Sequence, residues 1–355
     1  METFKTSEKI KEIIQRAYNQ NASDIHLHPE VGKYLLKYRI DGLLVDIQEL
    51  NIEETALLIS SIKVMSKLDI AQKRIPQDGS FKMPLKSANV DLRVSTVNTI
   101  KGEKIVLRLF RENPSIKTFK ELGLNQGQQQ IFKELLNIKS GMLLVTGPTG
   151  SGKTTTLYTA LSYIKDNTKN YITIEDPVEY QLDDVTQINV DAKIGLDFPK
   201  VLRAVLRQDP DGILIGEIRD KETAEIAIRA SLTGHIVLTT LHTEDCQSAI
   251  LRLVDMGIER YLLSGALKGI ISQRLVRVSC GCEGIDKDCR CNGTGYFNRT
   301  GIFELLPVND SMRTQIIEGK RNFKFKDLYL TLKEAGQEKV REGITDTKEI
   351  YRVIG

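Results

Sequence analysis

A glycine-rich segment, GPTGSGKT, has the residue types and spacing of a loop that binds phosphate groups. It follows the apolar run MLLVT and precedes KTTTLYTALSYI, which has the pattern of a helix. A strand, a glycine-rich loop and a helix in this order favour a nucleotide-binding loop over an ordinary glycine-rich turn. In such a loop the start of the helix attracts anions, Lys153 reaches the β and γ phosphates, and Thr154 ligates Mg²⁺. The predicted nucleotide-binding residues are Gly147, Pro148, Thr149, Gly150, Ser151, Gly152, Lys153, Thr154 and Thr155.

Acidic residues follow two other apolar runs. Glu175 ends YITIE, and Glu217 follows GILIG. Hydrolysis needs one carboxylate to hold or polarise water near the γ phosphate and another to help fix Mg²⁺. GILIG carries Gly216 where many P-loop enzymes place a Mg²⁺-binding aspartate, so we expect Thr154 and the phosphates to hold the metal, with help from Glu175 or Asp176. Taken alone, each carboxylate could instead be a helix N-cap or a surface charge.

Two of the four histidines flank the apolar run IVLTTL. His235 precedes this run and His242 follows it. In a parallel sheet the carboxyl end of such a strand lies beside the phosphate loop and its other end lies away from it. His242 is therefore favoured as the sensor of the γ phosphate, although an isolated histidine at such a position is more often structural.

From Gly141 onward, short runs that are apolar throughout alternate with helical stretches: MLLVTG, YITIED, DGILIGE and HIVLTTL. This pattern is typical of an α/β fold in which helices cover both faces of a parallel sheet. Ligands of such folds bind at the carboxyl ends of the strands. Farther along, we expect a strand at GIFELLPV and helices near 322–335 and 346–353.

The first 110 or so residues have the pattern of a smaller α+β domain. Helices are expected over 6–20 and 52–68, strands at DIHLHP and KYLLKYRIDG, and turns at PQDGSFKMP. VDLRVSTVNT and EKIVLRLF predict a hairpin. The predicted division is an N-terminal domain over 1–112, a linker over 113–125, and a P-loop ATPase domain over 126–355.

Composition narrows the class of protein. Of the 355 residues, 41% are hydrophobic and 27% charged, which indicates a folded chain, and a net charge of +3 does not favour a nucleic-acid surface. METFKTSEKIKEIIQR lacks the apolar core of a secretory signal, and YLLSGALKGIIS is shorter than the ~20 residues that a membrane span needs. We therefore expect a cytoplasmic protein that associates peripherally with the inner face of a membrane through a partner.

Four motifs, in order, resemble the Walker A, Asp box, Walker B and His box of the type II secretion and type IV pilus ATPases: GPTGSGKTTTLY, TIEDPVEY, LRQDPDGILIGEIRD and TGHIVLTTLHTEDC. The N-terminal ASDIHLHP, YRIDG and DLRVST also resemble that family. The resemblance implies a RecA-like core, a homohexameric ring and Mg²⁺-dependent ATP hydrolysis. It implies that Glu217 is the catalytic glutamate and Glu175 the essential acid of the Asp box. His235 and His242 would be the His-box pair.

The resemblance also implies that Arg93 and Arg108, on the predicted hairpin, reach the nucleotide. Lys153 alone cannot neutralise the charge that spreads over the phosphoryl oxygens during transfer. An arginine supplied by a mobile element can raise turnover ~10³–10⁵-fold. Without the resemblance, two arginines on a strand would be interpreted as part of a solvated face.

A cysteine insert over 280–291 contains Cys280, Cys282, Cys289 and Cys291. Such clustering favours a metal site in a reducing compartment over a disulfide framework. Assembly motors of the same family carry a four-cysteine zinc insert in the frame that CNGTGYFNRTGIFELL keeps. The pairs here are C-x-C rather than the common C-x-x-C, so a tetrahedral zinc site and a metal-free loop are both open.

The insert favours an assembly motor, because the family's retraction motors lack it. With its short N-terminal part, the chain most resembles the ATPases of the competence pseudopilus, which serves DNA uptake. The alternative is a type II secretion or type IV pilus extension ATPase. Expected partners are the other subunits of the ring and an inner-membrane platform protein, without direct contact to nucleic acid. A DNA-translocating P-loop ATPase and a nucleotide-binding scaffold without turnover are the alternatives from other classes.

Overall fold

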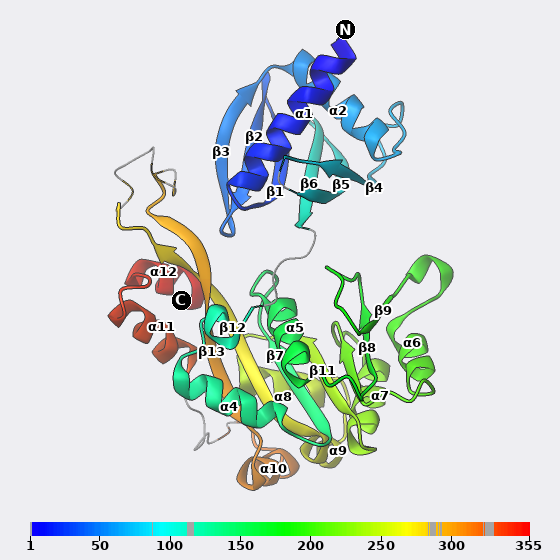
Figure 1. The fold of residues 1–355 in the computed structure, drawn as a ribbon, viewed down its shortest axis with the longest axis vertical. Coiled ribbons are helices and arrows are strands. Elements are labelled where there is room, and N and C mark those ends of the chain that lie inside the picture. The colour runs from blue at the N-terminus through cyan, green and yellow to red at the C-terminus, as the bar shows by residue number, and fades with distance from the viewer. Residues whose placement is uncertain are drawn as a thin grey trace. The chain divides into compact units, whose positions relative to one another are not determined.

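The computed structural model describes residues 2–86, 88–111, 117–282, 284, 289, 291, 293–321, 323 and 330–355. The chain divides into two compact units, Met1–Pro114 and Ser115–Gly355 (Figure 1). Within the described residues, no helix combines the length and the apolar character that crossing a membrane requires.

The first unit is an α+β domain, as predicted. Its elements are α1 Glu2–Asn19, β1 Ala22–Glu30, β2 Lys33–Ile40, β3 Leu43–Leu50, α2 Ile52–Met65, β4 Gln77–Pro84, β5 Asn89–Thr99 and β6 Gly102–Arg111. The described strands pair antiparallel in the order β3-β2-β1-β6-β5-β4. The prediction of turns at PQDGSFKMP is wrong, because alternation sends Phe81 and Met83 of β4 into the core.

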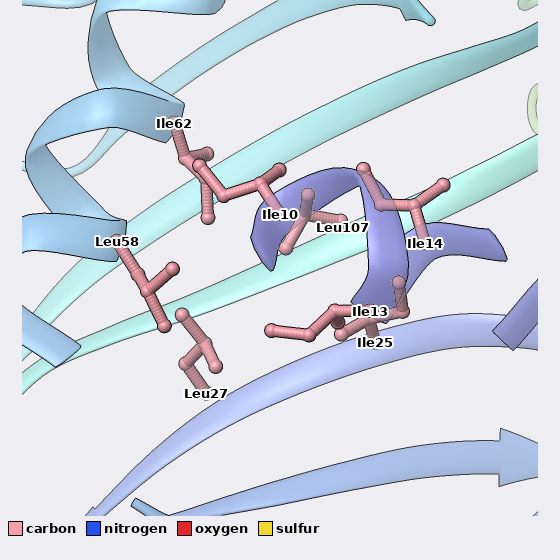
Figure 2. Close-up of a pocket in the computed structure, with 8 residues that line it drawn as sticks. All are labelled: Ile10, Ile13, Ile14, Ile25, Leu27, Leu58, Ile62 and Leu107. Carbon is pink, nitrogen blue, oxygen red and sulfur yellow. The ribbon is translucent and has the colours of Figure 1, made fainter. Parts of the chain in front are cut away.

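Apolar residues from one face of this sheet pack against α1 and α2 (Figure 2). They leave a cavity of about 10 Å³, which is at most the room that one water molecule needs. Isoleucines and leucines line it: Ile10, Ile13, Ile14, Ile25, Leu27, Leu58, Ile62 and Leu107. This cavity is a small packing gap rather than a ligand site, because its volume is too small for a ligand and its lining is apolar.

The second unit is built on a mostly parallel sheet with the order β13-β12-β7-β11-β10-β8-β9 among its described strands. Neighbouring strands run parallel except β12 and β13. Its elements are α3 Phe119–Leu122, α4 Gln126–Leu136, β7 Gly141–Thr146, α5 Lys153–Ile164, β8 Tyr171–Glu175, β9 Thr186–Asn189, the short 3₁₀ helix η1 Ala192–Ile194, α6 Phe198–Val205, β10 Gly212–Ile215, α7 Lys221–Leu232, β11 Ile236–Leu241, α8 Cys246–Asp255, α9 Arg260–Ala266, β12 Leu267–Ser279, β13 Tyr296–Pro307, α10 Asp310–Ile317, α11 Leu332–Arg341 and α12 Thr347–Ile354.

Alternate residues of the central strands pack on opposite faces. On β7, Met142 and Leu144 join the apolar cluster that includes α6 to α9, whereas Leu143 and Val145 join the cluster that includes α3 to α5. Strands buried on both faces are apolar at every position, which explains the short continuous runs in the sequence. The predicted α/β class with a parallel central sheet is confirmed.

Part of the stretch expected to be a linker, 113–125, belongs to the second unit. Residues 112–116 lie outside the described residues. α3 begins with a capping box at Thr118, and Phe119 and Leu122 are buried in the apolar core of this unit. A four-residue helix is too short to show helical periodicity, which is why composition alone predicted a linker there.

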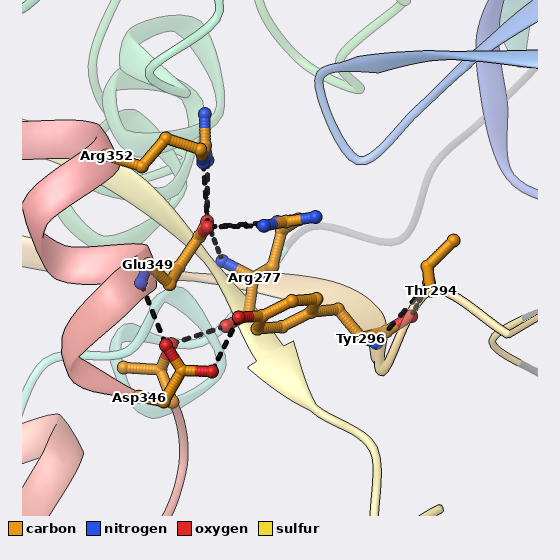
Figure 3. A network of polar contacts seen from close by, with 7 residues as sticks. Arg277, Thr294, Tyr296, Asp346, Glu349 and Arg352 are labelled. Atoms are coloured by element: carbon orange, nitrogen blue, oxygen red, sulfur yellow. Dashed lines mark hydrogen bonds and ion pairs between the residues drawn. The ribbon is translucent and has the colours of Figure 1, made fainter. Parts of the chain in front are cut away.

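The last helix, α12, and its cap residue Asp346 are tied to β12 and β13 by a polar network (Figure 3). Glu349 of α12, whose side chain is fully buried, accepts hydrogen bonds from Arg277 at 2.7 Å and Arg352 at 2.5 Å. The Arg277 guanidinium lies 3.8 Å from the ring centroid of Tyr296, whose hydroxyl donates to Asp346. Burial opposes the charge on Glu349, but the hydrogen bonds from both arginines outweigh it and lower its pKa to about 2.

The two helices expected near the C-terminus have different outcomes. The one near 346–353 is confirmed as α12. The one near 322–335 is wrong in its bounds, since α11 starts at Leu332 behind a Thr331 cap. Residues 322 and 324–329 lie outside the described part of the chain.

Candidate nucleotide site

The glycine-rich loop connects the carboxyl end of β7 to the first turn of α5, as its motif requires. Gly147, Gly150 and Gly152 have positive φ values of 151°, 77° and 89°. A Cβ atom on Gly147 would lie 2.5 Å from the carbonyl oxygen of Gln273, and one on Gly152 would lie 2.8 Å from its Nε2. β12 therefore supports the loop so closely that glycine is needed at both ends. The space around Gly150 is open, with nothing within 4 Å of an added Cβ.

Lys153 is buried at the base of this loop, with 8% of its surface exposed. Its ammonium group donates to the carbonyl oxygens of Gly147 at 2.9 Å and Pro148 at 3.0 Å. Burial lowers the pKa of Lys153 to about 8, although the Glu217 carboxylate opposes this shift. The side chain is thus held where it would meet phosphate oxygens.

The loop also offers oxygen atoms to a ligand. Thr154 and Thr155 are half-buried in the first turn of α5. The Oγ atom of Ser151 is buried without a hydrogen-bond partner in the described structure. A buried hydroxyl normally has a partner, so this atom fits a phosphate group. The hard oxygen donor of Thr154 fits Mg²⁺ in the same way.

Glu175 ends β8 and is 3% exposed. Its carboxylate accepts hydrogen bonds from Tyr158, from Thr173 at 2.6 Å and from Gln187 at 3.4 Å. Burial raises its pKa, while these hydrogen bonds oppose the rise. A Cβ atom on Gly216 would lie 3.4 Å from the Cα of Glu175, so the glycine there lets the two strand ends approach closely.

Glu217 follows β10, and its side chain is 17% exposed. One carboxylate oxygen accepts a hydrogen bond from Arg219, which also lies 3.6 Å from Asp176. The other oxygen is 3.3 Å from Nε2 of His242. Burial and the charge of Lys153 lower the pKa of His242, although Glu217 opposes the shift. The carboxylate of Glu217, the ring of His242 and the Lys153 ammonium therefore belong to one electrostatic group.

The structure separates the two histidines of the predicted pair. β11 is in register with β7 along its whole length, so His242 lies at the loop end and His235 at the opposite edge of the sheet. Nδ1 of His235 contacts the carbonyl oxygen of Ala230 at 3.0 Å. A strand of six residues therefore lies between His235 and the loop, as the sequence predicted, and a catalytic role for His235 stays a prediction.

Arg93 and Arg108 occupy the first unit and lie directly opposite each other on β5 and β6. The guanidinium of Arg93 lies 4.5 Å from the ring centroid of Phe110. Nε of Arg108 donates to Asp24 at 3.0 Å, and the Arg108 side chain is 64% exposed. Residues paired across strands share a face, so the two arginines act from the same side of the sheet. Their contact with nucleotide stays a prediction.

The four clustered cysteines have a geometry that fits zinc. Their Sγ atoms all lie within 4.8 Å of one another. Cys280 and Cys289 approach to 3.4 Å, and Cys282 and Cys291 to 3.1 Å, without forming disulfides. Four Zn–S bonds of about 2.3 Å in a tetrahedron place the sulfur atoms about 3.8 Å apart. The C-x-C pairs are thus compatible with a closed structural site.

Sequence reasoning missed three residues that shape the nucleotide site: Gln273, Tyr158 and Arg219. Gln273 is 1% exposed, and its Oε1 accepts a hydrogen bond from Thr156 at 2.7 Å. A glutamine inside the apolar run GIISQRLV was the available signal. Tyr158 gave no signal, because in a helix that packs against a sheet a tyrosine has the pattern of a core residue.

Comparisons with known proteins agree with this geometry. A family model described as "Type II/IV secretion system protein" matches residues 3–352. "Type II secretion system protein E" of Pseudomonas aeruginosa is 44% identical and covers 97% of this chain and 74% of its own length, and "Type II secretion system ATPase E" of Vibrio cholerae is 39% identical with the same coverage.

Solved structures are similar over nearly the whole chain. The pilus retraction motor PilT with bound ADP has a TM-score of 0.66 at 31% identity, covering 97% of this chain and 96% of that one. The Legionella pneumophila ATPase DotB has a TM-score of 0.75 at 23% identity, covering 97% and 94%, which bears on the fold alone. The predicted RecA-like architecture is thereby confirmed.

Proposed function

This chain belongs to the type II/IV secretion system protein family and is an ATPase of the type II secretion and type IV pilus class, and we propose that it is the motor that drives filament assembly in such a machine. The observation that carries the proposal is the meeting of the phosphate loop, Glu175 and Glu217 at the carboxyl ends of β7, β8 and β10. A scaffold that binds nucleotide without turnover would have no use for both carboxylates.

The proposed reaction is in-line attack of water on the γ phosphorus of ATP. The loop and the start of α5 bind the phosphates, and Lys153 balances their charge. Mg²⁺ held by Thr154 would add further positive charge at the phosphate oxygens. Glu217 accepts a proton of the attacking water while the bond from the γ phosphorus to the bridging oxygen breaks, which gives ADP and inorganic phosphate. His242, 3.3 Å from Glu217, is placed to sense the γ phosphate.

Glu175 has a different role in this proposal. It is more buried than Glu217 and is fixed by three hydrogen bonds, so it orients water and ligands around the metal rather than exchanging protons freely. Arg93 and Arg108 supply the additional positive charge that phosphoryl transfer needs. In a homohexameric ring, closure and reopening of subunits around the nucleotide would convert hydrolysis into movement.

The machine we propose is an extension machine of the type II secretion class. Two observations support it: curated relatives are named for type II secretion, and the cysteine cluster is present. The competence pseudopilus is the narrower expectation from the sequence, and it stays a second candidate. The proposed partner is a membrane platform protein on the cytoplasmic side, and the chain acts there without binding DNA.

Steady-state Mg²⁺-ATPase activity across a protein concentration series tests the motor proposal. We expect the rate per chain to rise as the protein oligomerises and to be indifferent to added DNA. A rate stimulated by DNA, with a steep dependence on salt, would support a DNA translocase instead. Loss of a secreted protein in a deletion strain would support the secretion machine, and loss of DNA uptake alone would support the competence machine.

A further inference from the structure

One row of charged residues crosses the sheet of the first unit on the face opposite α1 and α2. Arg39 of β2 pairs with Asp24 of β1, and Asp24 pairs with Arg108 of β6. Arg108 in turn pairs with Arg93 of β5. Directly paired residues share a face, with Cβ atoms about 4.5–5.5 Å apart. Three guanidinium groups and one carboxylate therefore lie side by side.

Asp24 occupies the middle of this row and is 5% exposed. Its Oδ1 accepts a hydrogen bond from Nε of Arg108 at 3.0 Å. Its Oδ2 accepts one from Ser23 at 2.7 Å and lies 3.6 Å from Nε of Arg39. The carboxylate thus contacts the inner, Nε edge of both guanidinium groups. One outer nitrogen of Arg39 donates to the carbonyl oxygen of Gly42 at 2.9 Å.

Because Asp24 contacts Arg108 at Nε, the outer nitrogens of the Arg108 guanidinium stay available to a ligand. A guanidinium group has five N–H donors in a fixed fork, so a carboxylate at Nε leaves the outer nitrogens available to another oxyanion. The Arg108 side chain is 64% exposed, which gives a ligand access to those nitrogens. Without the carboxylate, the neighbouring positive charges of Arg39 and Arg108 would repel each other.

We infer that Asp24 is a positioning residue for ATP hydrolysis: it orients Arg108 so that the outer guanidinium nitrogens meet a nucleotide phosphate, and it holds Arg39 beside it as a third cation of the same face. This inference rests on the proposed function, in which Arg108 supplies positive charge to the transferring phosphate group. Placement matters here, since a shift of 1 Å in a positioning group can cost about 10²-fold in rate.

The test compares Asp24→Asn with Asp46→Asn in the full chain. Asp46 lies on the same sheet, is 65% exposed and pairs with Lys37 at 3.0 Å, so it controls for loss of an acidic charge from this unit. We expect Asp24→Asn to lower kcat about 10-fold or more, because Arg108 loses its orientation. The Kd for a fluorescent ADP analogue should stay unchanged, because the phosphate loop lies in the second unit. Asp46→Asn should match the unaltered protein in both measurements.

A double variant separates positioning from a structural role. If Asp24 acts through Arg108, the double variant Asp24→Asn, Arg108→Ala should have a kcat less than about 3-fold below that of Arg108→Ala alone. Arg108→Lys should lose as much activity as Arg108→Ala, because one ammonium group cannot serve both carboxylate and phosphate in the same geometry. The inference would be overturned if the two substitutions lowered kcat independently, so that their factors multiply in the double variant. It would also be overturned if the Asp24 and Arg108 variants all lost thermal stability, or if Asp24→Asn and Asp46→Asn were equally active. ATP hydrolysis by the unaltered chain would still uphold the proposed function in that case.

Discussion

At the scale of single residues, Lys153 leads to the first prediction. Its pKa is about 8 because it is buried, and phosphate groups would raise it. Near pH 8.5 the ammonium group is mostly deprotonated, so nucleotide binding should take up a proton; at about pH 6.5 it is already charged and should take up none. Calorimetry in buffers of different ionisation enthalpy measures this uptake. A binding enthalpy that is independent of buffer near pH 8.5 would contradict the assignment.

Tyr158 gives a second prediction at this scale. Burial raises the pKa of Glu175, and the Tyr158 hydroxyl opposes that rise. Tyr158→Phe should therefore raise the pKa further, so the acid limb of the profile of kcat/KM against pH should move to higher pH. Tyr171→Phe is the control, since the Tyr171 hydroxyl donates to the Ile164 carbonyl oxygen instead. An unmoved acid limb would mean that the ionisation of Glu175 does not limit the reaction.

At the scale of elements, β12 supports the phosphate loop through Gln273. Gln273→Leu keeps the volume but removes the hydrogen bond to Thr156 and the amide beside Gly152. We expect KM for ATP to rise about 10-fold, because the loop loses its preorganised geometry. Gln315→Leu is a matched control in α10, where the glutamine is also buried. Equal KM values for the two variants would show that β12 does not shape the loop.

The ion pair between Glu349 of α12 and Arg277 of β12 should stabilise the folded chain, so removing it should lower the free energy of unfolding. Glu349→Ala leaves the buried side of Arg277 unpaired, and such changes cost about 3–5 kcal/mol. Because the folded pKa of Glu349 is about 2, its contribution should be present above the ordinary carboxyl pKa of 4.5 and be lost as pH falls toward 2. Urea unfolding at several pH values measures both effects. Equal stability of the variant and the unaltered chain at neutral pH would contradict this account.

Elements also show how far the sequence could predict the structure. The runs that form β7, β8, β10 and β11 were recognisable because strands buried on both faces are apolar throughout. Their shared carboxyl ends then placed Glu175, Glu217 and His242 near the loop. β4 was missed because Pro-Gln-Asp-Gly is rich in residues that form turns. Only packing in the folded domain, where alternate residues of β4 are buried, makes this segment a strand.

Contacts between distant residues could not be predicted in the same way. The row that joins Arg39, Asp24 and Arg108 depends on strand register, and those residues are far apart in the sequence. The support of the loop by Gln273 likewise depends on β12 lying next to β7.

At the scale of the whole molecule, the two units divide the work. The second unit holds the phosphate loop and both carboxylates, and the first holds three arginines in one row. The account therefore centres the reaction on Glu217 of the second unit. Its central claim is that this chain hydrolyses ATP and that Glu217 receives the proton of the attacking water.

Hydrolysis by Glu217→Gln, compared with Glu222→Gln, tests this claim most directly. Glu222 lies nearby in the first turn of α7 and is 57% exposed, so its substitution removes a similar charge without touching the site. We predict that Glu217→Gln lowers the rate about 10²–10⁴-fold, the usual contribution of a general base, while ATP binding is retained. Hydrolysis by Glu217→Gln at the rate of Glu222→Gln would contradict the account.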